Sequence, residues 1–335
     1  MSHLAVSENE VLAYIAASNP PRPMPTSGGP NLHDAAEVYR AAGVAALAQQ
    51  QHSTWLQYRL QPTDWKGAEQ YIAEQLAPSL EQLRTDGTIS SWWFLRKYPY
   101  WRLRVQAGPA ATRQQANRQL IHLLDFAVTS TALQRWTAGR YEPEVVAFGE
   151  AVFDDVHAFF HADSSAVLTL VRNSTAPNMP GRRELSLVLC SAMLRSARLD
   201  PLERADVWNR VTQQRPLTPE PNPHQLASTA ARLQRLTQLD TTNAPGSLFA
   251  AGQQLDSTAP WAAAYRTIGQ RLAEADESGV LDRGLRATLA TLVLHSWNRL
   301  GVATPAQGLL ARAACLAAKN DTLGSTHTTD RTPVR

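Results

Sequence analysis

The period with which apolar residues recur changes near Ala147, and this change constrains the fold more than any other feature. Before it, strand-like segments with alternating or aromatic-rich patterns are interspersed with segments that repeat every 3.6 residues. After it, five long segments all show the helical period, with proline-containing breakers between several of them. The chain is therefore predicted to be an α+β protein whose C-terminal half is mostly helical.

The first half has the element order of a split βαβ unit. Strands are predicted at 54–61, 89–98, 100–108 and near 133–144, with helices at 64–87 and 112–130. This order predicts a ferredoxin-like antiparallel sheet with helices on one face. We expect four regions along the chain: an N-terminal helical segment (1–52), the sheet region (53–146), a helical region that completes an active-site cleft (147–318), and a polar tail without fixed structure (319–335).

Composition and charge narrow the classes of partner. The net charge is +3, from 32 basic and 29 acidic residues, which is less than nucleic-acid binders usually carry and predicts no nucleic-acid partner. No run of about 18 apolar residues occurs, so no membrane-spanning helix is predicted. The N-terminus does not resemble a secretory signal, so the protein is not expected to be secreted. Cys190 and Cys315 lie far apart and outside any metal-binding motif. These features predict a cytoplasmic protein.

Two arginines alternate along the strand predicted at 100–108. Arg102 and Arg104 point to one face of that strand, while Trp101 and its apolar neighbours point to the other. The pair can clamp a carboxylate or hold peptide carbonyls through directed hydrogen bonds. Alternatively, the two arginines lie on an ordinary solvent-exposed strand face, and the residue pattern alone favours this second interpretation.

Aromatic and acidic residues flank this arginine strand in the sequence. Trp92, Trp93 and Phe94 are consecutive and cannot all face one side, so we expect one tryptophan in the core and another at a groove or interface. Glu142 and Glu144 lie at strand spacing. They can act as a general acid or base, pair with the arginines, or be exposed acids without a special role.

The helical half offers a weak metal motif. His157 and His161 lie one helical turn apart, but no convincing third ligand accompanies them, so no metal is predicted. Asp163 or Ser164, which follow directly, can cap a new helix.

A polar stripe interrupts the apolar segment "LVLHSWNRLG". His295, Asn298 and Arg299 share one face of the predicted helix. Buried polar groups must be satisfied, so these side chains either cross-link helices or face a ligand. His295 is the only attractive proton-transfer group in the helical half. No nucleotide-binding, nucleophile-elbow or zinc-protease motif occurs, and no cofactor is predicted.

These stretches, in this order, resemble one known family from about Thr54 to Ala318. It is the thiopeptide-type bacteriocin biosynthesis family, which is related to the C-terminal, glutamate-eliminating domain of class I lantibiotic dehydratases. The resemblance implies a small sheet with helices that continues into a helical half. The segments that carry it are "WLQYRL", "DWKGAEQYIAEQLAPSL", "WWFLRKYPYWRLRV", "RYEPEVVAFGE", "VHAFFHADSSAVL" and "HSWNRLG".

Two activities occur in this superfamily: elimination of glutamate from glutamylated Ser or Thr, and pyridine synthesis from two dehydroalanines. Eliminating relatives carry His-Leu-Arg-x-Arg on the strand and Tyr-x-Pro-Glu-x-x-Arg after it. This chain keeps Arg102, Arg104 and Glu144, but Trp101 replaces the histidine and Ala147 stands in the position of the second motif's arginine. The resemblance therefore implies a pyridine synthase that performs a formal aza-[4+2] cycloaddition, with loss of water and of the leader peptide.

The resemblance also implies roles and partners. Glu144, His295, Tyr58 and Tyr141 are the candidates for proton transfer. The partner is a modified precursor peptide, with leader and thiazole- and dehydroalanine-bearing core, and transient contact with dehydratase subunits is expected. The N-terminal helices are candidates for binding the leader. The candidates for substrate binding, including stacking on thiazoles by the tryptophans, are Arg102, Arg104, Trp93, Trp101, Glu142, Asn298, Arg299, Asp163 and Ser164.

Two other functions stay open at this point. The first is a stand-alone glutamate-elimination subunit of a split dehydratase, which would use the same arginine pair. The second is a subunit that binds the leader peptide without catalysis.

Overall fold

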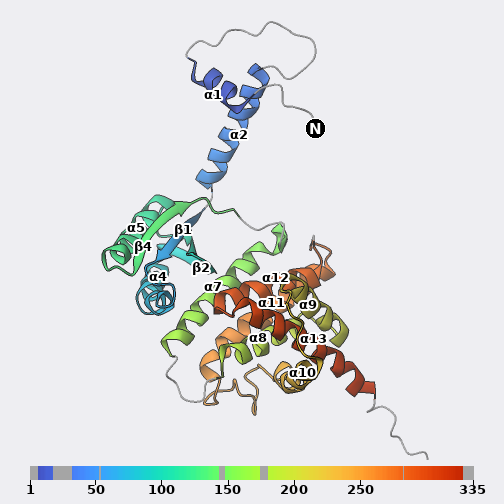
Figure 1. Cartoon of the computed structure of the whole chain (residues 1–335). Helices are drawn as coiled ribbons and strands as arrows, with labels where there is room; N and C mark the ends of the chain where they lie inside the picture. The colour runs from blue at the N-terminus through green and yellow to red at the C-terminus, as the bar shows by residue number, and fades with distance from the viewer. Residues whose placement is uncertain are drawn as a thin grey trace, which may run out of the picture. The chain divides into compact units, whose positions relative to one another are not determined.

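The computed structural model describes residues 7–17, 32–52, 54–142, 148–173, 180–281 and 283–326. The chain divides into two compact units, Met1–Thr54 and Trp55–Arg335. The smaller unit contains α1 (Glu8–Ala16) and α2 (Leu32–His52), both visible in Figure 1. A capping box between Ser7 and Glu10 starts α1, because each side chain bonds the backbone N–H of the other.

The larger unit begins with a four-stranded antiparallel sheet in the order β2-β3-β1-β4. The strands are β1 (Trp55–Pro62), β2 (Ile89–Lys97), β3 (Tyr100–Ala107) and β4 (Leu133–Gly139). This is the order of a split βαβ unit, so the predicted ferredoxin-like sheet is confirmed. One face, the helix-covered face, carries Tyr58 and Leu103 and packs under α4 (Ala77–Thr85) and α5 (Arg113–Thr129) (Figure 1).

The segment predicted as one helix at 64–87 is divided in three. It consists of α3 (Ala68–Tyr71), a π-helical turn (Ile72–Leu76) and α4. Pro78 lacks the N–H that would bond to Glu74 in a regular helix, and a widened turn before it accommodates the missing bond. The first helix of this segment begins at Ala68 instead of 64, and the Asp64 carboxylate before it accepts hydrogen bonds from the backbone N–H of Lys66 at 3.0 Å and of Gly67 at 2.8 Å.

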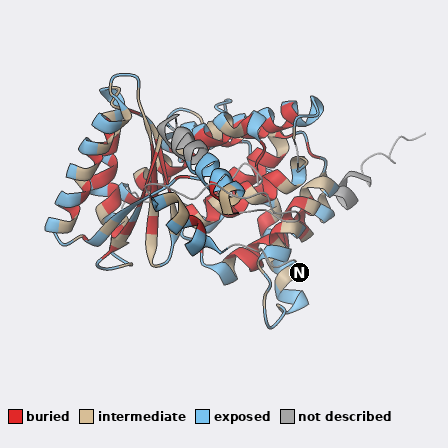
Figure 2. Cartoon of the chain, turned by 90° about the horizontal axis from the view of Figure 1, so that it is seen from above, coloured by how far each residue is buried: buried red, intermediate tan, exposed pale blue. Residues whose placement is uncertain are grey.

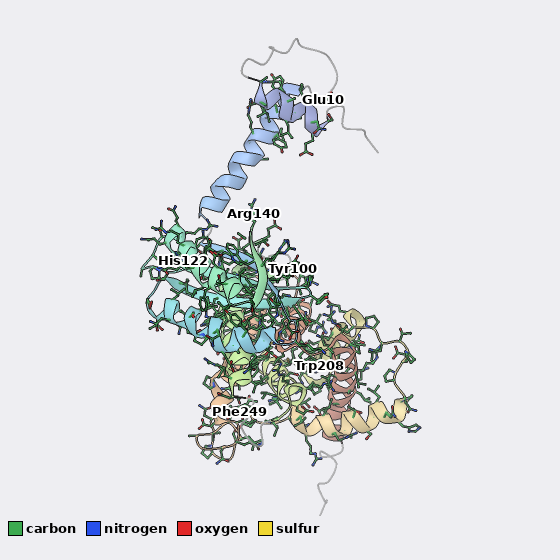
Figure 3. The ribbon with its side chains drawn as sticks, turned by 60° about the vertical axis from the view of Figure 1, so that its left-hand side comes forward. Glu10, Tyr100, His122, Arg140, Trp208 and Phe249 are labelled. Carbon is green, nitrogen blue, oxygen red and sulfur yellow. The ribbon has the colours of Figure 1, made fainter. Side chains whose placement is uncertain are left out.

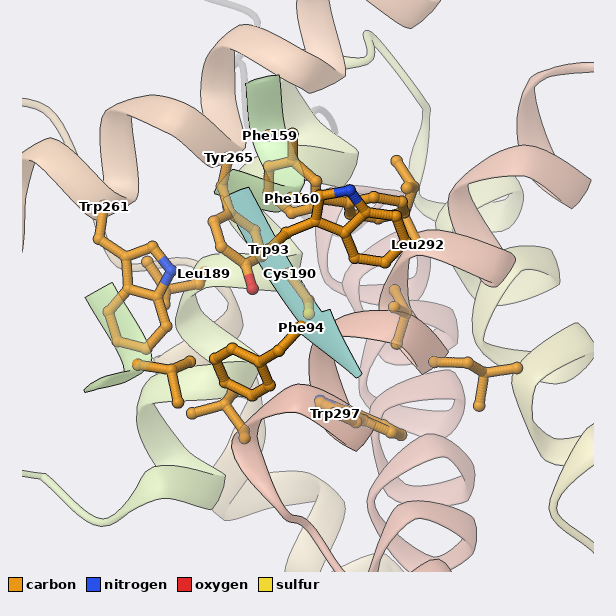
Figure 4. Packing of buried hydrophobic residues seen from close by; sticks show 14 of the residues in the cluster. Trp93, Phe94, Phe159, Phe160, Leu189, Cys190, Trp261, Tyr265, Leu292 and Trp297 are labelled. Carbon is orange, nitrogen blue, oxygen red and sulfur yellow. The ribbon is translucent and has the colours of Figure 1, made fainter. Parts of the chain in front are cut away.

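The remainder of the larger unit is helical, as predicted. Its helices are α7 (Phe153–Arg172), α8 (Arg182–Ser196), α9 (Pro201–Gln214), α10 (Pro223–Thr237), α11 (Ala259–Glu277), α12 (Leu285–Leu300) and α13 (Thr304–Thr326). Every side chain of α8 from Leu185 to Leu194 is buried, and Figure 4 labels Leu189 and Cys190 of this helix. Figure 2 shows buried residues in red throughout the interior of the helical half. Helices α11 and α13 were not among the segments expected from periodicity, and α13 continues into the stretch from Lys319 where a tail without structure was expected.

The helical half closes the outer edge of β2. The backbone N–H of Phe94 donates to Ser164 Oγ of α7 at 3.2 Å, and Arg299 Nε of α12 donates to the Phe94 carbonyl at 3.2 Å. His161 Nδ1 donates to the Trp92 carbonyl at 2.9 Å. An open strand edge invites pairing with other chains, and these side chains cover it. Their bonds also fix α7 beside the sheet. In the described part of the chain, no helix has the length and apolar character that crossing a membrane requires.

Candidate functional site

Arg104 lies on the second face of the sheet, here called the arginine face, which carries Gln57, Arg59, Trp93, Arg102 and Arg104. The side chain of Arg104 is only 3% exposed. Its Nε donates to Gln57 Oε1 at 2.9 Å, and Gln57 Nε2 in turn donates to the Arg140 carbonyl at 2.8 Å. The guanidinium carbon stands 4.2 Å from the centre of the Trp93 ring and 4.9 Å from that of Tyr141. These contacts hold the guanidinium in one orientation.

Tyr141 and His157 form a hydrogen-bonded pair beside Arg104. Tyr141 Oη lies 2.7 Å from His157 Nε2. Burial, with a smaller contribution from the Arg104 charge, lowers the pKa of His157 to about 4. The ring is therefore neutral near pH 7 and can accept the phenolic proton in this bond. Trp55 packs against His157 with ring centres 4.3 Å apart.

This histidine makes the stability of the fold depend on pH. The folded protein resists protonating His157 between its ordinary pKa of 6.5 and the folded value of about 4, whereas the unfolded chain accepts the proton. Stability is therefore lost as the pH falls through this window, on the order of 3 kcal/mol in total. Urea unfolding at pH 7 and pH 4, compared between the wild type and His157→Gln, isolates this contribution from that of His161. Parallel loss of stability in the two proteins would contradict the assignment.

His295 joins the same cluster through aromatic contacts. Its ring stacks on Phe160 with an interplanar angle of 6° and centres 5.3 Å apart, and meets Phe148 edge-on at 5.6 Å. Phe160 also packs against Trp93, with ring centres 4.6 Å apart; Figure 4 labels both residues. A continuous aromatic path thus runs from Arg104 through Trp93 and Phe160 to His295, linking the sheet to α12. The predicted proton-transfer residues Tyr141 and His295 border this path.

Arg299 and Asp163 occupy a different position from the one expected of substrate-binding residues. Both are fully buried and form an ion pair with each other. Asp163 Oδ1 also accepts hydrogen bonds from Trp261 Nε1 at 2.8 Å and Tyr265 Oη at 2.9 Å. This network cross-links α7, α11 and α12, so the geometry favours structural roles for these residues over contact with a substrate.

The side chains of Ser164 and Asn298 also form hydrogen bonds that link elements of the fold. Ser164 is buried and bonded to β2, and α7 continues through it, so the expected helix start at Asp163 or Ser164 is wrong. Asn298 Oδ1 accepts from Gln307 Nε2 at 3.0 Å, which links α12 to α13. Arg102 is partly buried on the arginine face and Glu142 is exposed, while Glu144 lies outside the described residues.

Neither predicted tryptophan is available for stacking on a substrate in this structure. Trp93 and Trp101 are each 1% exposed. The expectation that one of Trp92 and Trp93 lines a groove is wrong, because both faces of β2 are covered: Trp92 Nε1 donates to Glu81 of α4 at 2.9 Å, and Trp93 packs under Phe160 of α7. Trp55, which is only partly buried beside Tyr141, is better placed to meet a ring.

Tyr58 lies on the helix-covered face, away from the cluster around Arg104. Its Oη donates to Asn117 Oδ1 of α5 at 2.6 Å, and burial raises its pKa to about 12. Tyr58→Phe is therefore expected to cost about 0.5–1.5 kcal/mol of stability and to leave turnover within about twofold of the wild type. Thermal unfolding together with turnover assays measures both quantities, and a hundredfold loss of turnover in a folded variant would place Tyr58 in the reaction.

Four residues of the cluster were not predicted from the sequence: Trp55, Gln57, His157 and Phe160. Strand alternation in "WLQYRL" could have placed Gln57 beside Arg104, since every second residue shares a face. His157 was considered only as half of a metal motif. In the described part of the chain, no group of three or more metal-ligating side chains occurs.

A cavity of about 650 Å³ lies on the other side of the β2 edge. Side chains of α4, α7 and α11 line it, among them Glu81, Arg84, His161 and Trp261. It includes none of the predicted site residues, so the cavity and the cluster around Arg104 are separate features.

Comparisons with solved structures give the fold relatives of the chain. MibB, a tRNA-dependent lantibiotic dehydratase from Microbispora sp. 107891, superposes with a TM-score of 0.60 at 18% identity, over 82% of this chain and 28% of MibB. TbtD, a pyridine synthase from thiomuracin biosynthesis, superposes with a TM-score of 0.51 at 16% identity, over 80% of this chain and 98% of TbtD. TsrL superposes with a TM-score of 0.52 at 16% identity, over 84% of this chain and 100% of TsrL. This chain therefore spans only about a quarter of the dehydratase.

Sequence comparison assigns the family. No curated protein sequence matches the chain. Residues 55–318 match the family described as the C-terminal part of lantibiotic biosynthesis dehydratases, which covers the sheet and nearly all of the helical half. The chain belongs to the lantibiotic biosynthesis dehydratase C-terminal family.

Proposed function

We propose that the chain is a pyridine synthase of thiopeptide biosynthesis. It joins two dehydroalanines of a thiazole-containing precursor peptide by a formal aza-[4+2] cycloaddition. The cyclised intermediate then loses water and releases the leader peptide as an amide, which leaves an aromatic pyridine. TbtD, one of the fold relatives, is a pyridine synthase, and that likeness supports the proposal at the level of the fold.

The enclosure of Arg104 by aromatic rings is the observation that carries this proposal. An elimination site must offer its arginines to a free glutamyl carboxylate. Here the guanidinium of Arg104 is covered by Trp93 and Tyr141 and bonded to Gln57, in a setting suited to peptide amides and aromatic heterocycles. The replacement of the eliminators' arginine by Ala147 points the same way.

The reaction begins with proton transfer. One amide of the peptide must lose its N–H proton and gain a proton on oxygen, which produces the azadiene that reacts with the second dehydroalanine. Tyr141, paired with His157, and His295 are acid–base groups beside the aromatic path, and Glu144 is proposed as their carboxylate partner from the sequence resemblance. Holding two dehydroalanines in contact can account for several kcal/mol of the barrier.

The substrate-binding roles change in light of the structure. Arg102 and Arg104 remain proposed as substrate-binding residues, and Trp55 takes the stacking role predicted for Trp93 or Trp101. Proton transfers are assigned to side chains, and no cofactor is included in the proposal.

Separate feeding of two substrates tests the assignment. A thiazole-bearing peptide with two dehydroalanines is expected to yield pyridine, whereas a glutamylated peptide is expected to remain unchanged. Release of glutamate from the second peptide, without pyridine from the first, would establish the elimination function. Binding of the leader without turnover of either peptide would indicate a non-catalytic subunit.

A further inference from the structure

The arginine face carries a second row of cations beyond Arg104. The register places Arg59 of β1 directly opposite Arg102 of β3. Opposite residues of an antiparallel pair project to the same side, with Cα atoms about 4.5–5.5 Å apart. Like charges in this arrangement destabilise a sheet. The uncharged residues Leu95 and Thr137 complete the row on the two outer strands.

The next row along the sheet is also free of acidic residues. Arg135 of β4 donates from Nε to Gln61 Oε1 at 2.8 Å and from Nη2 to Tyr100 Oη at 3.1 Å. Lys97 lies opposite Tyr100 on β2. Tyr100 of β3 lies on the arginine face, whereas His122 belongs to α5, which covers the opposite face of the sheet; Figure 3 labels both residues. The two rows together hold four cations.

Arg59 and Arg102 differ from the arginines of this protein that form internal ion pairs. Arg59 is exposed and Arg102 partly buried, and the side chain of neither makes a hydrogen bond or ion pair with another residue in the described ranges. In contrast, Arg96 pairs with Glu69, and Arg299 with Asp163. Within the residues that the structure describes, the fold thus accepts a repulsive pair at this position without a carboxylate to neutralise it.

We propose that Arg59, together with Arg102, binds carboxylate groups of an acidic stretch in the peptide substrate. The inference rests on the proposed function in so far as the substrate is a peptide. A guanidinium matches a carboxylate through two parallel hydrogen bonds. The rows lie two residues apart along each strand, about 7 Å, which is also the spacing of alternate side chains in an extended peptide. Acidic residues at every second position therefore fit both rows.

A binding assay on the full chain tests this inference without turnover. The probe is a fluorescein-labelled peptide of alternating glycine and glutamate with an amidated C-terminus, measured by anisotropy at low salt. Arg59→Ala is expected to weaken binding about five- to twentyfold, and Arg59→Lys to restore part of it. Relief of repulsion is expected to leave the Tm of Arg59→Ala unchanged or about 1–3 °C higher. Arg118→Ala, on the exposed side of α5, is the matched control and is expected to bind normally.

Further arms identify the source of the charge. A glutamine version of the probe is expected to bind weakly and equally to the wild type and Arg59→Ala. If the glutamine probe bound only when its C-terminus was free, the site would recognise a terminal carboxylate. The proposal that it binds an acidic stretch would then be wrong. If a single-stranded RNA bound more tightly than the peptide, and this binding depended on Arg59, the site would be a nucleic-acid site and the proposal of an acidic peptide ligand would be wrong. A fall in Tm that accompanies the loss of binding would indicate a structural role instead.

Failure of this inference is distinguishable from failure of the proposed function. If the wild type forms pyridine but Arg59→Ala binds the acidic probe normally, the carboxylate site alone is refuted. If probe binding depends on Arg59 but no pyridine forms, the pyridine synthase assignment alone is refuted.

Discussion

Arg299→Ala is expected to lower the free energy of unfolding by about 3–5 kcal/mol. The substitution removes the cation that pairs with Asp163, and both side chains are fully buried. It also removes the hydrogen bond from Nε to the Phe94 carbonyl, which ties α12 to the edge of β2. The large cost arises because the Asp163 carboxylate would remain buried without its cation, and the neutral donors Trp261 and Tyr265 do not balance its charge.

Urea denaturation measures this effect, and an exposed ion pair provides the control. Arg198 and Glu277 form an ion pair in which the side chains are 61% and 58% exposed. Arg198→Ala is therefore expected to cost no more than about 1 kcal/mol. Removing both buried charges, in Asp163→Leu with Arg299→Leu, is expected to recover much of the loss. An Arg299→Ala protein that keeps wild-type stability and loses only peptide affinity would restore Arg299 as a substrate-binding residue.

His295→Phe is expected to reduce turnover about 10²- to 10⁴-fold while leaving the fold intact. Phenylalanine keeps an aromatic ring against Phe160 and Phe148, so stability is expected to remain within about 1.5 kcal/mol of the wild type. The substitution removes both ring nitrogens and with them proton transfer at this position.

Single-turnover kinetics on the dehydroalanine peptide measures the loss, and His122→Phe is the matched control. His122 is exposed on α5, so its replacement is expected to leave turnover unchanged. If His295→Phe retained wild-type turnover, His295 would be a packing residue of the aromatic path, and the proton transfer would belong to Tyr141 and its partners.

The sequence was sufficient for the sheet because local patterns determine it. Strand alternation predicted that Arg102 and Arg104 share a face, and the order of elements predicted the strand order. Helices α11 and α13 escaped prediction because alanine fills many of their buried positions, and alanine marks an apolar face less clearly than a large hydrophobic residue does.

The cluster around Arg104 was only partly predictable, because its contacts join elements far apart in the sequence. Gln57, Arg104 and His157 meet only after β1 pairs with β3 and α7 docks on β2. The polar stripe on α12 was correctly identified, but the sequence could not separate the roles of two of its members: His295 stacks beside the cluster, whereas Arg299 pairs with Asp163 in the core. That difference depends on the packing of three helices.

Mass spectrometry of a dehydrated, thiazole-bearing precursor peptide, incubated with the protein, provides the decisive test of pyridine synthesis. The wild type is expected to yield a pyridine-containing macrocycle and a released leader amide, and Arg104→Ala is expected to yield neither product. Peptide that binds the wild type but is recovered with its leader attached and both dehydroalanines intact would contradict the claim.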